Sequence, residues 1–184
     1  MALESSAVNL TANFYMKNFY KFNRNAIKAA DRKEFSQTEL SYEDTRALKR
    51  AIAKLGTFEY EDTDNDENLR NTVKAFVETY NHTVETTSSK DSNTYKLNKQ
   101  LKELTSKYGD KLDDLGIRIQ DDGKLKINDN ILKESSSKEL KAVFAKDSDY
   151  MKDIRQITRR MNNEAHDEVY AMMTGCGGRL NIIL

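Results

Sequence analysis

Apolar residues recur every three or four positions along most of this chain, which is the spacing of one face of an α-helix. This pattern predicts helices over about residues 6–30, 41–56, 67–86, 95–108 and 148–173, with shorter helical turns between 128 and 144. The sequence contains no proline, so the strongest interruption of a long helix is missing. The predicted class is mainly α, a bundle of about five or six helices.

The ends of these helices carry local signals. Ser41-Tyr42-Glu43-Asp44 resembles a capping box, so a helix is expected to begin there. Gly56 and Gly109 are expected to end the helices that precede them, because glycine accepts the backbone conformation found after a helix.

One stretch departs from the helical spacing. Ile117 and Ile119 alternate with polar residues, as do Leu125 and Ile127, and Asp122-Gly123 stands between the two runs. An Asp-Gly pair between alternating runs is a strong hairpin signal. The sequence therefore predicts one small β-hairpin at about 117–127. Its four apolar side chains need cover, for which the candidates are Phe76, Tyr80, Leu101, Leu104 and Phe144.

The first and last helices carry long apolar stripes. Their candidate interaction residues are Phe14, Tyr15, Phe19, Phe22, Ile154, Ile157, Met161 and Val169. Packing inside the chain is one interpretation of these stripes. A surface for self-association or for a partner protein is the other, because the helices of the middle region can cover the hairpin by themselves. The spacing in the last helix also suits two coiled-coil-like heptads.

The hairpin region also resembles a known family. Leu115-Gly116-Ile117, Asp122-Gly123-Lys124-Leu125 and Val143-Phe144 are similar to the C-terminal region of the bacterial flagellar filament-capping proteins, which are hook-associated proteins. Phe76-Val77 and Tyr80-Asn81 resemble the helix that precedes this region in the family. The resemblance covers roughly residues 69–161. It implies a helical leg domain that assembles in a ring at the filament tip, without enzymatic activity.

Length and charge suit one soluble domain. We expect residues 1–184 to form a single domain, in which N-terminal helices (1–60) and a C-terminal helix with its tail (148–184) flank the family-like unit. Thirty Lys and Arg balance thirty Asp and Glu, which indicates neither a nucleic acid nor a membrane surface as partner. The N-terminus shows no cleavable signal. An extracellular, flagellum-associated location follows if the resemblance holds, and a cytoplasmic one otherwise.

No constellation for chemistry emerges from the sequence. His82 and His166 are the two histidines, both expected on solvated helix faces, and two such ligands do not make a catalytic zinc site. Residues 62–66 alternate aspartates as calcium loops do, but the glycine and the bidentate glutamate of such loops are missing. Cys176, the single cysteine, lies in a glycine-rich tail with no base nearby in sequence. We therefore expect no metal, no cofactor and no catalytic residue.

Two functions remain open from the sequence. The first is a non-enzymatic structural or assembly protein related to the filament cap, which acts by helix–helix self-association or by binding a protein partner. The second is a soluble helical domain that binds an unknown partner or ligand and has no connection with flagella.

Overall fold

The computed structural model describes residues 10–61 and 66–175. It confirms a mainly helical fold with one hairpin. The α-helices are α1 (Ala12–Phe19), α2 (Gln37–Gly56), α3 (Asp66–Thr86), α4 (Tyr95–Lys107), α5 (Gly109–Asp113), α6 (Asp129–Glu134), α7 (Ser137–Phe144) and α8 (Asp149–Gly175). The strands are β1 (Ile117–Ile119) and β2 (Leu125–Ile127), and two 3₁₀ turns, η1 (Arg24–Ile27) and η2 (Asp31–Glu34), follow α1.

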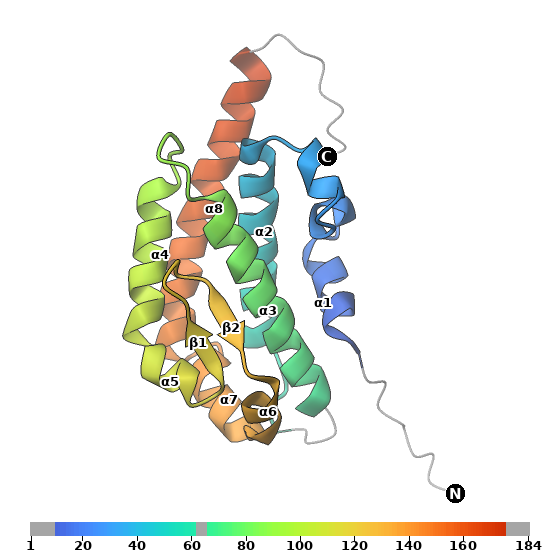
Figure 1. Ribbon diagram of the computed structural model, residues 1–184, viewed down its shortest axis with the longest axis vertical. Helices are drawn as coiled ribbons and strands as arrows, with labels where there is room; N and C mark the ends of the chain where they lie inside the picture. Colours follow the sequence, from blue (N-terminus) through green and yellow to red (C-terminus); the bar gives the residue numbers. More distant parts are fainter. Residues whose placement is uncertain (1–9, 62–65, 176–184) are drawn as a thin grey trace, which may run out of the picture.

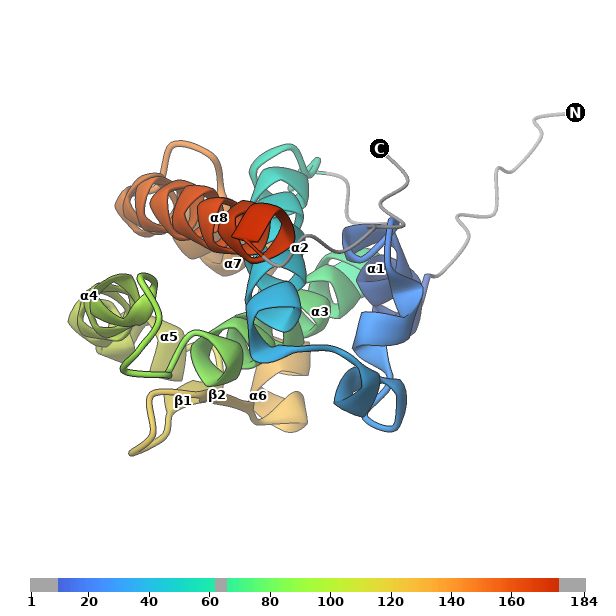
Figure 2. The same cartoon turned by 90° about the horizontal axis from the view of Figure 1, so that it is seen from above.

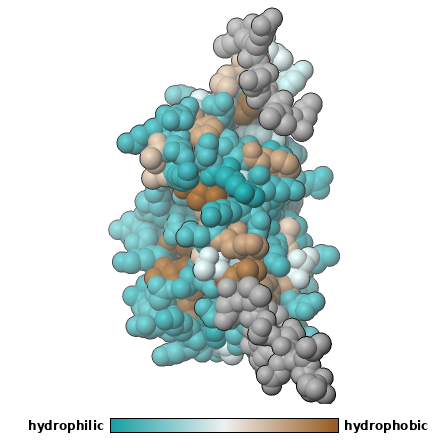
Figure 3. Space-filling view, turned by 90° about the vertical axis from the view of Figure 1, so that its right-hand side faces the viewer, coloured by the Kyte–Doolittle hydropathy of each residue, from teal (hydrophilic) through white to brown (hydrophobic). Residues whose placement is uncertain are grey.

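Helix α3 lies at the centre of the arrangement (Figure 1). It packs against α2, α1 and β2, while α8 packs against α2 and α4. Seen from above, α8 and α2 lie on one side, α3 and α4 lie in the middle, and the hairpin with α6 lies on the other side (Figure 2). The side that carries α1 is mostly hydrophilic, with separate apolar patches (Figure 3). In the described ranges, no helix combines the length and apolar character needed to cross a membrane.

The hairpin joins the hydrophobic core as the alternation predicts. Ile119 pairs with Leu125 in antiparallel register, and Gly123 takes a φ of 84° in the turn between the strands. Ile117 and Leu125 are buried, while the other two apolar side chains of the hairpin are partly buried against the core. All five expected cover residues, Phe76, Tyr80, Leu101, Leu104 and Phe144, are buried in the same cluster.

The first helix is much shorter than predicted. α1 ends at Phe19, and the chain continues through η1 and η2 instead of remaining helical to residue 30. The reason is tertiary. Tyr20 is fully buried, with its hydroxyl hydrogen-bonded to Asp44 of α2, and the chain then turns so that Arg32 meets the same carboxylate.

Two predicted helix ends are also wrong. α2 begins at Gln37, where Ser36 and Glu39 form a capping box, whereas Ser41 is buried inside the helix. The pattern of Ser36 and Glu39 has the same spacing as the one at Ser41, and the structure uses the earlier of the two. Gly109 does not end α4, because α4 ends at Lys107 and Gly109 is the first residue of α5.

Candidate functional site

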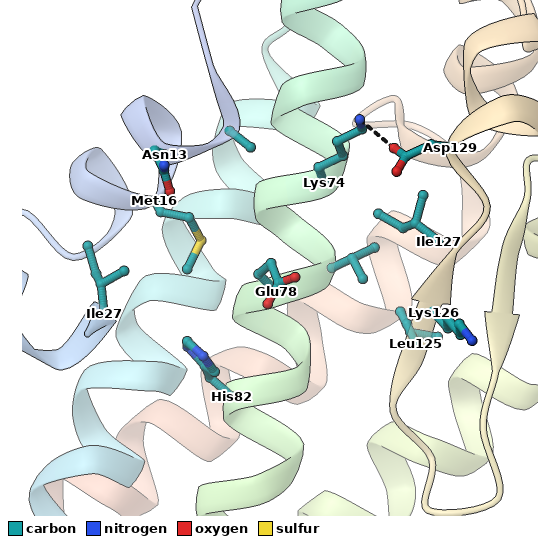
Figure 4. A pocket seen from close by; sticks show the side chains of 12 residues that line it. Asn13, Met16, Ile27, Lys74, Glu78, His82, Leu125, Lys126, Ile127 and Asp129 are labelled. Carbon is teal, nitrogen blue, oxygen red and sulfur yellow. Dashed lines mark ion pairs between the residues drawn. The ribbon is translucent and has the colours of Figure 1, made fainter. Parts of the chain in front are cut away.

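A groove of about 580 Å³ runs over the surface of α3. Figure 4 shows α1 and η1 on one side, the hairpin with the start of α6 on the other, and α3 between them. The lining residues are Ala12, Asn13, Met16 and Ile27 from the first wall, Lys74, Val77, Glu78 and His82 from the floor, and Leu125, Lys126, Ile127 and Asp129 from the second wall. Segments distant in the sequence thus build a single site.

The first wall is fastened to α3 by polar contacts at the start of α1. The backbone N–H of Leu10 donates to Asn68 Oδ1 at 2.5 Å, and Asn71 Nδ2 donates to the carbonyl of Leu10 at 2.8 Å. Farther along, the hydroxyl of Thr79 lies 3.3 Å from the sulfur of Met16, which is buried. These contacts fix the distance between α1 and the floor of the groove.

The second wall is fastened by Asn81. Its side chain donates to the carbonyl of Leu125 at 2.8 Å and accepts from the N–H of the same residue at 2.7 Å. One amide side chain thereby occupies both polar backbone groups of this β2 residue, as a neighbouring strand would. Lys74 adds an ion pair to Asp129, 2.5 Å from Nζ to Oδ1, at the start of α6.

A buried polar network lies behind His82. The hydroxyl of Tyr20 donates to Asp44 Oδ1 at 2.7 Å and lies 3.1 Å from His82 Nδ1. Because the hydroxyl has a single hydrogen, this pattern assigns the proton of a neutral His82 ring to Nδ1 and leaves Nε2 as an acceptor. Burial lowers the pKa of His82, which favours that neutral ring.

The carboxylate of Asp44 is fully buried, and both of its oxygens accept hydrogen bonds. Arg32 donates two hydrogen bonds to it, at 3.0 Å from Nη1 and 2.7 Å from Nη2, and the hydroxyl of Thr86 donates at 2.8 Å. Burial raises the pKa of Tyr20 well above its usual value, and the charge of Asp44 raises it further. A carboxylate with all these donors is a structural anchor rather than a free base.

The lining of the groove combines apolar side chains with polar and charged ones. Met16 and Leu125 of the walls and Val77 of the floor are buried, whereas Glu78 and Lys126 are exposed. This mixture suits a ligand that has apolar groups and some polar ones. In the ranges 10–61 and 66–175, no three His, Cys, Asp or Glu side chains gather in a way that could hold a metal ion.

The predicted interaction residues fall into two groups. Phe14 and Phe22 are exposed, by 43% and 58%, and Ile157 is partly buried. The other five, Tyr15, Phe19, Ile154, Met161 and Val169, are buried. The reason is that α1 covers α2 and α3, and α8 covers α2 and α4, so these stripes belong to the chain's own core. These five side chains do not form an exposed surface on this folded chain.

Sequence reasoning missed the groove because its walls meet only in the folded chain. It also placed His82 in solvent, whereas this side chain is partly buried and bonded to Tyr20, 62 positions away. His166 is exposed as expected. The one signal in the sequence that could have indicated part of the groove is the spacing of Lys74, Glu78 and His82, which lie one turn apart on one face of α3. Residues 62–65 and Cys176 lie outside the described residues.

Comparisons of the chain with protein-family models, with curated proteins and with solved structures found no match.

Proposed function

We propose that this protein is a non-enzymatic assembly protein that binds a segment of a partner protein in the groove over α3. The observation that carries the proposal is the construction of the groove. A helix and a hairpin, each fastened to α3 by side-chain hydrogen bonds, leave a channel between them whose walls carry both apolar and polar side chains. Preorganised channels of this kind suit the apolar face of a helix or an extended peptide.

The relationship to the filament-capping proteins is part of this proposal. It rests on the residues that resemble the family, including Leu115-Gly116-Ile117 and the Asp122-Gly123 turn. Two of them have a structural role that supports it. Gly116 directly precedes the hairpin and Gly123 lies in its turn; both take positive φ, and the hairpin forms one wall of the groove. Under this proposal, the partner segment belongs to flagellin or to another subunit of the filament.

The test is a titration of the protein with flagellin monomers from the same organism. Asn13 is exposed and lines the groove, so Asn13→Arg places a long charged side chain in the channel. We expect it to weaken binding about tenfold or more, because an unpaired charge opposes an apolar segment. Asn18→Arg is the matched control, an exposed position of α1 that does not line the groove.

Two outcomes would contradict different parts of the proposal. Equal affinity of the two variants for flagellin would show that flagellin does not bind in the groove. If the wild-type protein does not bind flagellin, flagellin is not its partner.

A small ligand is the second candidate for the groove. Its volume lies in the range of small-molecule sites, and the neutral ring of His82 offers an acceptor nitrogen at the floor. A small ligand would raise the thermal midpoint of the wild-type protein and raise that of Asn13→Arg less.

A further inference from the structure

A second surface, none of whose residues lines the groove, combines one exposed ring with several cations. The ring of Phe22, 58% exposed, lies 4.0 Å from the guanidinium carbon of Arg46, 4.7 Å from Lys21 Nζ and 4.8 Å from the guanidinium carbon of Arg50. We call Lys21, Phe22, Arg46 and Arg50 the Phe22 surface. It belongs to the turn after α1 and to the middle of α2.

The Phe22 surface concentrates positive charge in a chain whose formal net charge is zero. Arg46, Arg50 and Lys54 follow one another at intervals of four along α2, and like charges at this spacing repel each other. Burial lowers the pKa of Arg50, and the charge of Arg46 lowers it further. An approaching anion would relieve this repulsion.

The compensation available inside the chain is partial. Glu43 lies 3.7 Å from Arg46, with the side chain of Arg46 28% exposed. Burial raises the pKa of Glu43, while the charges of Arg46 and Arg50 lower it, so a single carboxyl is shared by the two arginines. Arg50 uses one N–H to hold the carbonyl of Phe19 at 2.5 Å, which orients its guanidinium beside the ring.

We propose that the Phe22 surface binds an acidic segment of another protein, in which carboxylates flank an apolar side chain. Carboxylates pair with the cations of Lys21, Arg46 and Arg50, and an apolar side chain covers the exposed part of the Phe22 ring. Such combinations of an aromatic anchor and arginines are typical of protein interfaces. The proposal is independent of the groove over α3.

The acidic run of a second copy of this chain is a less suitable ligand for the Phe22 surface than an acidic segment of a different protein. Six acidic residues lie between 59 and 67, so a second copy could in principle supply the segment. Two of them are already engaged, however: Glu61 pairs with Lys141 at 2.5 Å, and Asp66 pairs with Arg70 and accepts a hydrogen bond from Ser137. A nucleic acid is disfavoured by the zero net charge.

The test measures the fluorescence anisotropy of a labelled synthetic peptide of glutamate and leucine as the full-length protein is added. The variants are Lys21→Gln/Arg46→Gln, which removes two cations, and Phe22→Ser, which removes the ring. Both positions in the first variant avoid Arg50, which also holds Phe19. The control is Lys96→Gln/Lys99→Gln, which removes two exposed cations from α4, where Lys99 lies over Tyr95 at 4.8 Å. Circular dichroism establishes that each variant is folded.

We expect the double variant to bind the peptide about tenfold more weakly at low salt, and Phe22→Ser to bind it several-fold more weakly. The control should bind as the wild type does, and binding should weaken as salt is added. Equal affinities in the double variant and the control would overturn the proposal. So would self-association of the wild type that the double variant abolishes, which would assign the surface to a second copy, or tighter binding of a short DNA duplex than of the peptide.

Discussion

At the scale of the residue, Gly116 shows why the Leu-Gly-Ile motif cannot vary freely. Its φ is 75°, a left-handed conformation that side chains with a Cβ rarely adopt. A Cβ at this position would also lie 2.8 Å from the Cβ of Ile131 and 2.9 Å from the carbonyl oxygen of Asn128. The glycine thus lets the start of the hairpin approach α6 closely.

Gly116→Ala should therefore destabilise the protein by about 2–4 kcal/mol, the sum of backbone strain and overpacking. Gly109→Ala is the control, because the nearest atom to its Cβ is a methyl carbon of Ile119 at 3.6 Å and the glycine is helical. That change should be neutral or slightly stabilising. Urea unfolding of the two variants gives both values. Similar free energies of unfolding for the two variants would show that the protein does not require a glycine at position 116.

His82 should make stability depend on pH. Its pKa is lowered in the folded protein, from an ordinary value of 6.5, because the ring is buried. Between the lowered value and 6.5 the unfolded chain binds more protons, so the free energy of unfolding should fall as the pH drops below about 6.5. Carboxylates with lowered pKa, such as those of Glu85 and Asp129, lose their contribution only at more acidic pH.

His82→Asn should flatten this dependence, because the amide nitrogen can replace Nδ1 as a donor to Tyr20 and does not titrate. The measurement is the free energy of unfolding in urea at several pH values between about 5.5 and 7.5. A slope that is the same in the variant and the wild type would mean that other groups cause it.

At the scale of the element, the segment from α1 to η2 depends on one buried ion pair. Arg32 donates two hydrogen bonds to Asp44, whose side chain is fully buried. Burial alone would lower the pKa of Arg32, but its contact with Asp44 raises that pKa. Removing the cation leaves a buried carboxylate without its counterion. The segment carries Ile27, which lines the groove, so the ion pair also supports the site.

Arg32→Met should cost about 3–5 kcal/mol of stability for this reason. Lys33→Met, a change of the same kind at the next and exposed position, should cost almost nothing. Thermal unfolding of the two variants compares them directly. Equal midpoints would show that Asp44 finds its compensation elsewhere.

The hairpin, in turn, depends on Asn81. Asn81→Ala leaves the N–H and carbonyl of Leu125 without the partners that they have in the groove wall, which should cost about 1–3 kcal/mol. Amide hydrogen exchange should also accelerate at Leu125. Asn130→Ala, at an exposed position of α6, is the control. Unchanged exchange at Leu125 would mean that the hairpin holds its place without Asn81.

These elements differ in how far the sequence predicts them. The hairpin follows from alternation and an Asp-Gly turn, signals contained within a few residues, and α3 follows from a regular apolar stripe. The early end of α1 depends instead on Tyr20 reaching Asp44, 24 positions away. No pattern of neighbouring residues in the sequence predicts a contact between positions so far apart. For the same reason, the groove could not be predicted, although each of its lining residues was visible in the sequence.

At the scale of the whole molecule, α3 connects the groove with the hydrophobic core. One face of this helix is the floor of the groove, and the opposite face packs against α2 in the core. The groove therefore rests on a rigid helix, and its walls are tied to that helix at Leu10 and Leu125. A rigid site costs little ordering when a partner segment binds.

The most direct measurement of the central claim, that the groove receives a protein segment, is site-specific photo-crosslinking. A benzophenone side chain would replace Asn13 in one protein and Asn18 in another, and each would be irradiated with flagellin monomers. If the groove receives the partner segment, position 13, which lines the groove, should give a crosslinked product, and position 18, which does not, should give little or none. Equal crosslinking at the two positions, or crosslinking from position 18 alone, would contradict this claim.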